Sequence, residues 1–374
     1  MESLYIHVPF CHRKCAYCSF YSVADSGRVE AYLDALGREM AARCRPGTPP
    51  PVRTLYVGGG TPSLLTVGQH SRLKQMLACH YNMENMKEST VEANPEDLSP
   101  DYLSGLAALG LYNRISIGVQ SFSDDELRAI NRRHTGSQAR RAVCMAAEAG
   151  FDNISIDLIY GLPGQTLAGW RQTLDEAFSL PVKHISAYAL TVEPGTILDR
   201  QLQQGRAVLP GEEATLAMYD EMLRRVRARG NWVQYEVSSF SDVRFQAVHN
   251  RNYWRGLAYT GFGAAAHSYD LSARRWNVAD VDRYIATLDH DSETLTDADR
   301  YNEMLMLGLR TCAGVSVGRA RREFPQYFAQ FERGMKEMEA RRWVRRMPVG
   351  GGHYCPTYTG MLHADGMAAE LFIA

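Results

Sequence analysis

The sequence has no long apolar run and almost no net charge. No stretch approaches the roughly 18–20 apolar residues that a membrane-spanning helix needs. Its 41 lysines and arginines balance 42 aspartates and glutamates, so no global field draws the chain to nucleic acid or to an anionic membrane. Only four residues precede Tyr5, which leaves no room for a signal peptide. We therefore expect a cytoplasmic protein with no membrane span and no nucleic-acid partner.

Cysteine is uncommon, and three of the eight cysteines are clustered. Cys11, Cys15 and Cys18 have C-x3-C-x2-C spacing directly after a short apolar run. A disulfide would leave one of the three unpaired, and His12 lies inside the first spacing, where it is poorly placed to complete a zinc site. Three thiolates can hold three irons of a [4Fe–4S] cluster, and the open fourth iron can chelate S-adenosylmethionine. The spacing therefore predicts a cluster with these three cysteines as its metal ligands.

Strand-like apolar runs alternate with helical patterns in the first half of the chain. The six runs begin near Leu4, Thr54, Ser89, Arg114, Asn153 and His184. Helical patterns between them include Val29–Arg43, Pro100–Leu109, Ser137–Ala149 and Leu167–Ser179. This alternation predicts an α/β fold whose parallel strands are joined by helical crossovers.

The pattern changes after about residue 285, where helical segments follow one another. They are Asp297–Arg310, Val317–Phe324 and Tyr327–Arg341. We therefore divide the chain into a barrel domain, residues 1–285, and a small C-terminal helical domain, residues 286–374. A winged-helix arrangement of the second domain is one interpretation.

Small and polar residues follow the predicted strands at the points where the strands end. They include Gly59, Gly60 and Thr61 after the second strand, Glu92 in the third, Gln120 after the fourth and Asp157 in the fifth. In parallel α/β barrels the carboxyl ends of the strands form the active face. These residues are therefore expected on one rim, where the cysteine loop after the first strand also emerges.

Several segments together resemble the radical S-adenosylmethionine superfamily and, within it, the oxygen-independent coproporphyrinogen III oxidase family. The segments are YIHVPFCHRKCAYC, GGGTPSLL, EANPEDLS, NRISIGVQSF, INRRHTG, DLIYGLPGQT, ISAYALTVEPGT and NEMLMLGLR. The resemblance implies an incomplete (β/α)6 TIM-like barrel with a small, mainly helical C-terminal domain. It also implies a [4Fe–4S] cluster and S-adenosylmethionine as cofactors.

The resemblance further implies which residues bind the cofactor. Tyr5 and Tyr17 match neighbours of the cluster and the adenine. The segment of Gly59, Gly60 and Thr61 matches the stretch that meets the methionine amino end, where missing side chains allow close backbone approach. The positions that match binders of the cofactor's polar groups are Glu92, Gln120, Arg132 and Asp157.

Two departures from the oxidases concern the cluster region. The oxidases carry another cysteine two residues past the third, but here Cys18 is followed by Ser19 and Phe20. The oxidases also have a substantial segment ahead of the cluster, whereas ten residues precede Cys11 here. In both features the sequence resembles the oxidase-like branch known as HemW-type heme chaperones.

A later segment also resembles that branch. Residues 249–254 read H-N-x-x-Y-W, similar to its heme-binding signature. An imidazole can ligate heme iron, and aromatic rings suit a flat apolar macrocycle. We therefore predict that His249, Tyr253 and Trp254 contact heme, with core packing as the alternative. His267 is a second candidate histidine.

The resemblance implies a heme chaperone that passes heme to apo-proteins. Two alternatives remain open: a coproporphyrinogen III oxidase that decarboxylates by radical chemistry, and a radical enzyme that acts on heme itself. Whether S-adenosylmethionine is cleaved, and whether the protein is a homodimer, stays open at this point.

Overall fold

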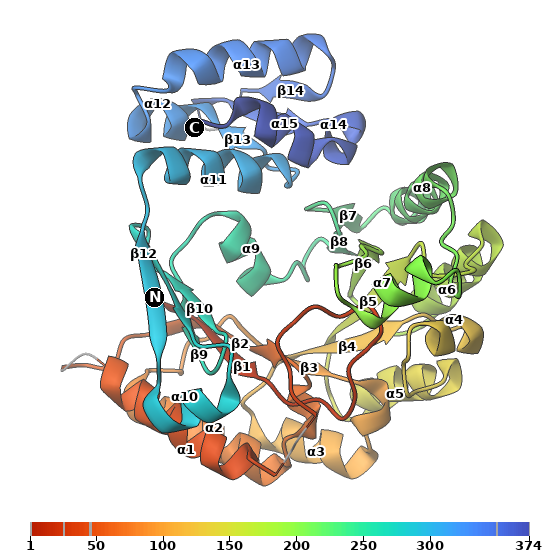
Figure 1. The fold of residues 1–374 in the computed structure, drawn as a ribbon, viewed down its shortest axis with the longest axis vertical. Helices are drawn as coiled ribbons and strands as arrows, with labels where there is room; N and C mark the ends of the chain where they lie inside the picture. Colours follow the sequence, from red (N-terminus) through yellow and green to blue (C-terminus); the bar gives the residue numbers. More distant parts are fainter. Residues whose placement is uncertain (1, 25–26, 45–46, 349–350, 374) are drawn as a thin grey trace.

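A computed structural model describes residues 2–24, 27–44, 47–348 and 351–373. Its largest element is a nine-stranded sheet with the strand order β7-β8-β6-β5-β4-β3-β2-β1-β9 (Figure 1). Six consecutive parallel strands form its centre: β1 Glu2–Val8, β2 Val52–Gly59, β3 Glu88–Ala93, β4 Arg114–Gln120, β5 Asn153–Tyr160 and β6 His184–Ala189. The two edge strands do not pair with each other, so the barrel is open. The predicted incomplete (β/α)6 barrel is confirmed.

Helices follow the strands, and most of them cover the outer side of this sheet (Figure 1). The helices are α1 Val29–Arg43, α2 Val67–His80, α3 Pro100–Leu109, α4 Asp124–Ala129, α5 Gly136–Glu148, α6 Leu167–Ser179, α7 Ile197–Gln203 and α8 Glu212–Ala228. The short α4 and α7 lie instead beside the cysteine loop (Figure 1). Short 3-10 helices, Pro62–Leu64 and Pro95–Asp97, follow β2 and β3. Strands covered on both faces read as continuous apolar runs, and Ile115, Ile117 and Ile156 are fully buried. No helix in the described part of the chain is long and apolar enough to cross a membrane.

The remaining elements of the first 294 residues extend the sheet at its two edges or flank it. Strand β8 (Ser239–Asp242) pairs antiparallel with β6 and with β7 (Trp232–Gln234), and β9 (Thr260–Phe262) pairs parallel with β1. Helix α9 (Val248–Trp254) lies between β8 and β9 in the chain and contacts β2. An antiparallel sheet follows, made of β10 His267–Tyr269, β11 Ala273–Asn277 and β12 His290–Thr294, with α10 Val281–Thr287 between the last two.

The C-terminal part is a helical unit with its own apolar core. Its elements are α11 Asp297–Leu309, β13 Val315–Ser316, α12 Val317–Glu323, α13 Phe328–Ala340, β14 Val344–Met347, β15 His353–Pro356, α14 Tyr358–Leu362 and α15 Ala364–Leu371. The core includes Tyr301, Leu305, Phe331 and Met335, and the strands form a small sheet in the order β13-β15-β14. The predicted helical C-terminal domain is confirmed, whereas the boundary at residues 285 and 286 stays a prediction.

Candidate cofactor site and a second cavity

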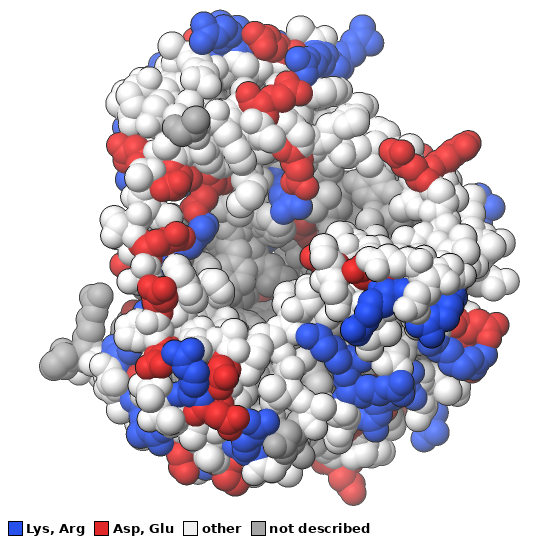
Figure 2. Space-filling view, in the orientation of Figure 1, with Lys and Arg blue, Asp and Glu red and all other residues white. Residues whose placement is uncertain are grey.

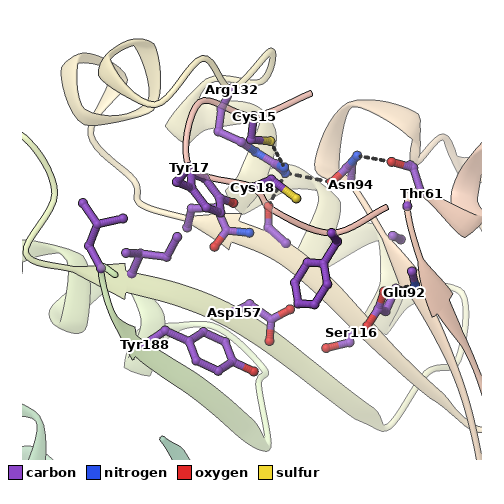
Figure 3. A pocket seen from close by; sticks show the side chains of 18 of the residues that line it. Cys15, Tyr17, Cys18, Thr61, Glu92, Asn94, Ser116, Arg132, Asp157 and Tyr188 are labelled. Carbon is purple, nitrogen blue, oxygen red and sulfur yellow. Dashed lines mark hydrogen bonds between the residues drawn. The ribbon is translucent and has the colours of Figure 1, made fainter. Parts of the chain in front are cut away.

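A cavity of about 410 Å³ lies at the carboxyl ends of the parallel strands. Figure 3 shows that its side chains come from the cysteine loop after β1, from the ends of β2–β6 and from the loop after α4. Of the predicted residues, those that line it are Cys15, Cys18, Tyr17, Gly59, Gly60, Thr61, Glu92, Gln120, Arg132 and Asp157. The fold thus brings side chains from distant parts of the sequence to one cavity, at the strand ends where they were expected.

Backbone hydrogen bonds fix the cysteine loop beside this cavity. The Ala16 N–H donates to the Ile130 carbonyl at 3.0 Å, and the Leu198 N–H donates to the Ala16 carbonyl at 2.8 Å. The Cys11 sulfur, which does not line the cavity, accepts a hydrogen bond from the Thr61 hydroxyl at 3.2 Å. Within the described ranges, no three Cys, His, Asp or Glu side chains converge on a single-ion site. A cubane cluster binds each thiolate at a different iron, so its ligands need not converge in that way.

Arg132 connects the cysteine loop to the strand ends. Its Nη1 lies 3.3 Å from the Cys15 sulfur, and its Nη2 donates to the Asn94 Oδ1 at 2.8 Å (Figure 3). Asn94 in turn donates to the Thr61 hydroxyl at 3.2 Å. A Cβ on Gly118 would lie 3.4 Å from both Arg132 and Asn94, so glycine keeps this corner open. The buried Arg132 Nε has no hydrogen-bond partner among the described residues, which leaves a donor for a carboxylate.

Two buried carboxylates lie across the cavity from Arg132 (Figure 3). Glu92 accepts hydrogen bonds from the Tyr56 hydroxyl at 2.7 Å and from the Gly59 N–H at 3.1 Å. Burial nevertheless raises the pKa of Glu92 to about 7, and burial also raises the pKa of Asp157. A buried carboxylate of this kind gains from a cationic or hydroxyl partner, because burial penalises its unpaired charge.

Gly59 and Gly60 are also needed by the packing of the chain itself. Gly59 has a φ of +109°, and a Cβ there would lie 2.5 Å from the His7 ring. A Cβ on Gly60 would lie 2.7 Å from the Phe10 carbonyl. Both glycines therefore make room for the protein's own β1 segment as well as bordering the cavity.

Polar cavity residues outside the predicted set include Asn94, Ser116 and Tyr188. All three lie in or directly after a parallel strand, so the strand-end rule could have found them. Tyr5, in contrast, does not line this cavity; its hydroxyl lies 2.9 Å from the His7 Nδ1 and it lines a second one.

The second cavity, of about 590 Å³, is bordered by the barrel, by the ribbon of β10 and β11, and by α11 of the C-terminal part. Figure 2 shows the surface hollowed between the C-terminal part and the barrel. Its aromatic side chains are Tyr5, Phe20, Tyr21, Tyr253, Tyr259 and Tyr269, and its histidines are His7 and His267. Phe20 lines both cavities, so the two are neighbours across one side chain.

Of the three predicted heme contacts, the structure brings only Tyr253 to this cavity. His249 is fully buried, its Nδ1 lies 2.9 Å from the Thr54 hydroxyl and its Nε2 lies 2.8 Å from the Tyr253 hydroxyl. Burial lowers the pKa of His249 to about 3. Trp254 lies beneath the Arg310 guanidinium, 6.0 Å from ring centre to Cζ, and lines neither cavity. In this structure His249 offers no free ring nitrogen; it holds Tyr253 against the cavity.

Comparison with known proteins places this chain in a family. The family model for the radical SAM superfamily matches residues 5–177, and the model for the HemN C-terminal domain matches residues 295–363. The heme chaperone HemW of Bacillus subtilis (strain 168) is 39% identical over 327 residues, which cover 85% of this chain and 86% of that protein. The chain belongs to the HemW family of radical SAM proteins.

Other relatives agree in sequence and in fold. The heme chaperone HemW of Escherichia coli (strain K12) is 36% identical over 71% of this chain and 69% of that protein. The structure of the coproporphyrinogen III oxidase of Escherichia coli, a radical SAM enzyme, matches with a TM-score of 0.83 over 99% of this chain and 89% of that chain. At 24% identity this second likeness shows the fold alone.

Membership of the radical SAM superfamily implies a [4Fe–4S] cluster and S-adenosylmethionine, and the first cavity fits both. Cys11, Cys15 and Cys18 supply three thiols from one loop. The free Nε of Arg132 suits the carboxylate of the cofactor, and the buried Glu92 suits its ammonium group. When bound there, the cluster would supply the electron that cleaves the sulfonium C–S bond. The individual roles of these residues stay a prediction.

Proposed function

We propose that this protein binds heme and delivers it to heme-requiring apo-proteins in the cytoplasm. Two observations support the proposal. HemW-family relatives at 36–39% identity carry the name heme chaperone. The chain also has, next to its cofactor cavity, a second cavity large enough for a cofactor-sized ligand.

The second cavity is the observation that carries the proposal. Its volume of about 590 Å³ lies within the roughly 300–1,000 Å³ typical of ligand sites, and it lies between two structural units, where such sites are common. Six aromatic side chains line it, which suits a flat and largely apolar macrocycle. The open shape between the barrel and α11 also leaves a route by which heme can leave for an acceptor (Figure 2).

Transfer can be tested directly. The protein, with its cluster reconstituted anaerobically, is loaded with one equivalent of heme, separated from free heme and mixed with excess apomyoglobin. We expect a shifted Soret band on loading, followed by appearance of the holomyoglobin spectrum faster than from heme bound to serum albumin. Failure of the purified protein to bind heme would contradict the proposal. So would bound heme that apomyoglobin cannot remove.

A second candidate is radical decarboxylation of coproporphyrinogen III, which the adjacency of the two cavities favours because a porphyrinogen in the second would lie beside the radical source. Against it, Phe20 occupies the position where the oxidases have a cysteine, and its side chain is 70% exposed between the cavities. We expect no decarboxylation when reduced protein, S-adenosylmethionine and coproporphyrinogen III are combined anaerobically. Stoichiometric release of carbon dioxide would establish the enzyme function instead.

A further inference from the structure

We infer that His267, rather than His249, supplies the iron ligand for heme in the second cavity, and that Arg274 binds the heme carboxylates. The inference rests on the proposed function, since it names the residues that would hold the proposed cargo. It assigns to β10 and β11 a role that the H-N-x-x-Y-W signature on α9 does not include.

The availability of ring nitrogens separates the histidines near the cavity. His7 lines it, but the His7 Nδ1 lies 2.9 Å from the Tyr5 hydroxyl and its Nε2 lies 3.2 Å from the Tyr21 carbonyl. His249 does not reach the cavity, and both of its nitrogens are also engaged. The His267 side chain is partly exposed at the cavity and has no hydrogen bond to any described residue. Of these three, only His267 presents a lone pair to an incoming metal.

The His267 ring is held in place although it makes no hydrogen bond. It packs against the Trp276 ring across the β10–β11 pair, with 6.0 Å between centroids and 26° between planes. Its backbone lies against Gly261, where a Cβ would come within 2.1 Å of the His267 carbonyl. Burial lowers the pKa of His267, which favours the neutral imidazole that ligates iron. The ring is therefore oriented and in the right protonation state before a ligand arrives.

The aromatic side chains that line the second cavity from α9 and the segment after it are fixed in place. Tyr253 and Tyr259 pack edge to face with 4.6 Å between ring centroids, and the Tyr253 hydroxyl is fixed by His249. Tyr5 adds a third ring from β1. Such fixed rings can sandwich a planar ligand without losing much side-chain freedom. His249 is therefore a positioning residue, because it acts on the cavity through the hydroxyl of Tyr253.

Arg274 provides the charge that heme carboxylates require. It is the one arginine or lysine among the described residues that line the second cavity. In the β10–β11 pair, Tyr269 lies opposite Arg274 and His267 lies opposite Trp276, so His267 and Arg274 occupy positions two residues apart along the ribbon. Such diagonal neighbours lie on one face of an antiparallel pair, about 7–8 Å apart. A ligand whose metal lies at His267 can therefore reach Arg274 with a carboxylate on its edge.

Arg274 is partly neutralised in the absence of such a ligand. Its guanidinium contacts the Glu303 carboxylate of α11 and lies 3.8 Å from a Glu293 oxygen. Burial raises the pKa of Glu303, so this carboxylate is easier to protonate than an exposed one. Heme carboxylates can then replace Glu303 as the partner of Arg274. The exchange would also loosen a contact between the ribbon and the C-terminal part.

The test is an anaerobic heme titration followed by absorption spectroscopy. It compares wild type, His267→Ala, His249→Gln and His290→Ala, with iron content and circular dichroism confirming that each variant is folded. The glutamine at 249 keeps hydrogen-bonding groups but removes the imidazole, and His290 is an exposed histidine on β12. We expect His267→Ala alone to lose the histidine-ligated Soret band and to bind heme roughly tenfold or more weakly. Added imidazole should restore that band in His267→Ala.

Binding of the heme carboxylates by Arg274 is tested in a second set of heme titrations. Arg274→Ala should weaken heme binding without changing the ligation spectrum. Heme dimethyl ester, whose carboxylates are blocked, should bind wild type and Arg274→Ala equally well. Equal heme affinity in wild type and Arg274→Ala would remove Arg274 from the site.

The outcomes distinguish this inference from the proposed function. If wild type binds heme and His267→Ala has the same affinity and spectrum, the inference is wrong and the function stands. Loss of the histidine-ligated band in a folded His249→Gln protein would return the ligand to His249 and also overturn the inference. If wild type binds no heme, the proposed function and the inference both fail.

Discussion

Replacing Glu92 by glutamine is expected to remove a pH dependence from the binding of S-adenosylmethionine. Glu92 lies on β3 in the cofactor cavity, and burial raises its pKa to about 7 despite hydrogen bonds from Tyr56 and Gly59. Near neutral pH the free protein is therefore a mixture of the acid and the carboxylate. An ammonium group bound beside Glu92 favours the carboxylate, so binding releases the proton that the free protein holds.

The sign and size of the effect follow from that pKa. Below pH 7 Glu92 is increasingly protonated in the free protein, so cofactor affinity should fall as the pH falls. About half of the carboxylate is charged at pH 7 and about 1% at pH 5, which corresponds to a roughly fifty-fold loss of affinity, or about 2.3 kcal/mol. Between about pH 5 and pH 7 the α-amino group of the cofactor stays protonated, because such groups lose their proton at about pH 8.

Calorimetry in two buffers of different ionisation enthalpy measures both the affinity and the number of protons released. We expect wild type to release close to one proton near pH 6 and Glu92→Gln to release fewer, with a flatter affinity profile. Glu236→Gln is the matched control, because burial also raises the pKa of Glu236 but this residue does not line the cofactor cavity. An equal slope in wild type and Glu92→Gln would refute the pairing of Glu92 with the cofactor.

Three further predictions concern the cluster, the cofactor and the signature histidine. Cys15→Ala should lose the cluster, and with it about four irons per chain, whereas Cys144→Ala should keep them. An iron content of Cys15→Ala equal to that of wild type would contradict the ligand assignment. Arg132→Lys should retain iron but bind S-adenosylmethionine more weakly by roughly 1.5–3 kcal/mol in calorimetry, because lysine lacks the paired N–H donors of arginine. Unchanged affinity would exclude a contact between Arg132 and the cofactor carboxylate. His249→Ala should lower the free energy of unfolding, measured by urea denaturation, by about 2–4 kcal/mol, because the change removes two buried hydrogen bonds and leaves a void. A free energy of unfolding equal to that of wild type would contradict the structural role of His249.

Local sequence was sufficient for the parallel strands and for part of the cofactor cavity, whereas the incomplete barrel was implied by the family resemblance. Buried parallel strands are continuous apolar runs, and helical crossovers alternate with them, so the parallel strands β1–β6 could be predicted. Because the carboxyl ends of such strands meet at one face, Thr61, Glu92 and Asp157 were expected together and do line one cavity. Arg132 lies outside any strand, and only the family resemblance pointed to it.

The short strands β10–β12 were not predicted. They are three to five residues long and carry mixed polar and apolar side chains, so no period of two is visible in the sequence. Their pairing depends on contacts within a ribbon that only the folded chain defines. The same is true of the small sheet β13-β15-β14 in the C-terminal part.

The residue types of the two histidines were evident from the sequence, but their surroundings were not. A short motif shows that an imidazole is present on α9, yet the direction in which its nitrogens point is set by packing against β2, nearly two hundred residues earlier in the chain. That packing engages both nitrogens of His249 and leaves those of His267 free beside the second cavity. Residue type and the alternation of strands with helices can be read from local sequence. The accessibility of a lone pair is a property of tertiary contacts, because burial and hydrogen bonding by distant residues determine it.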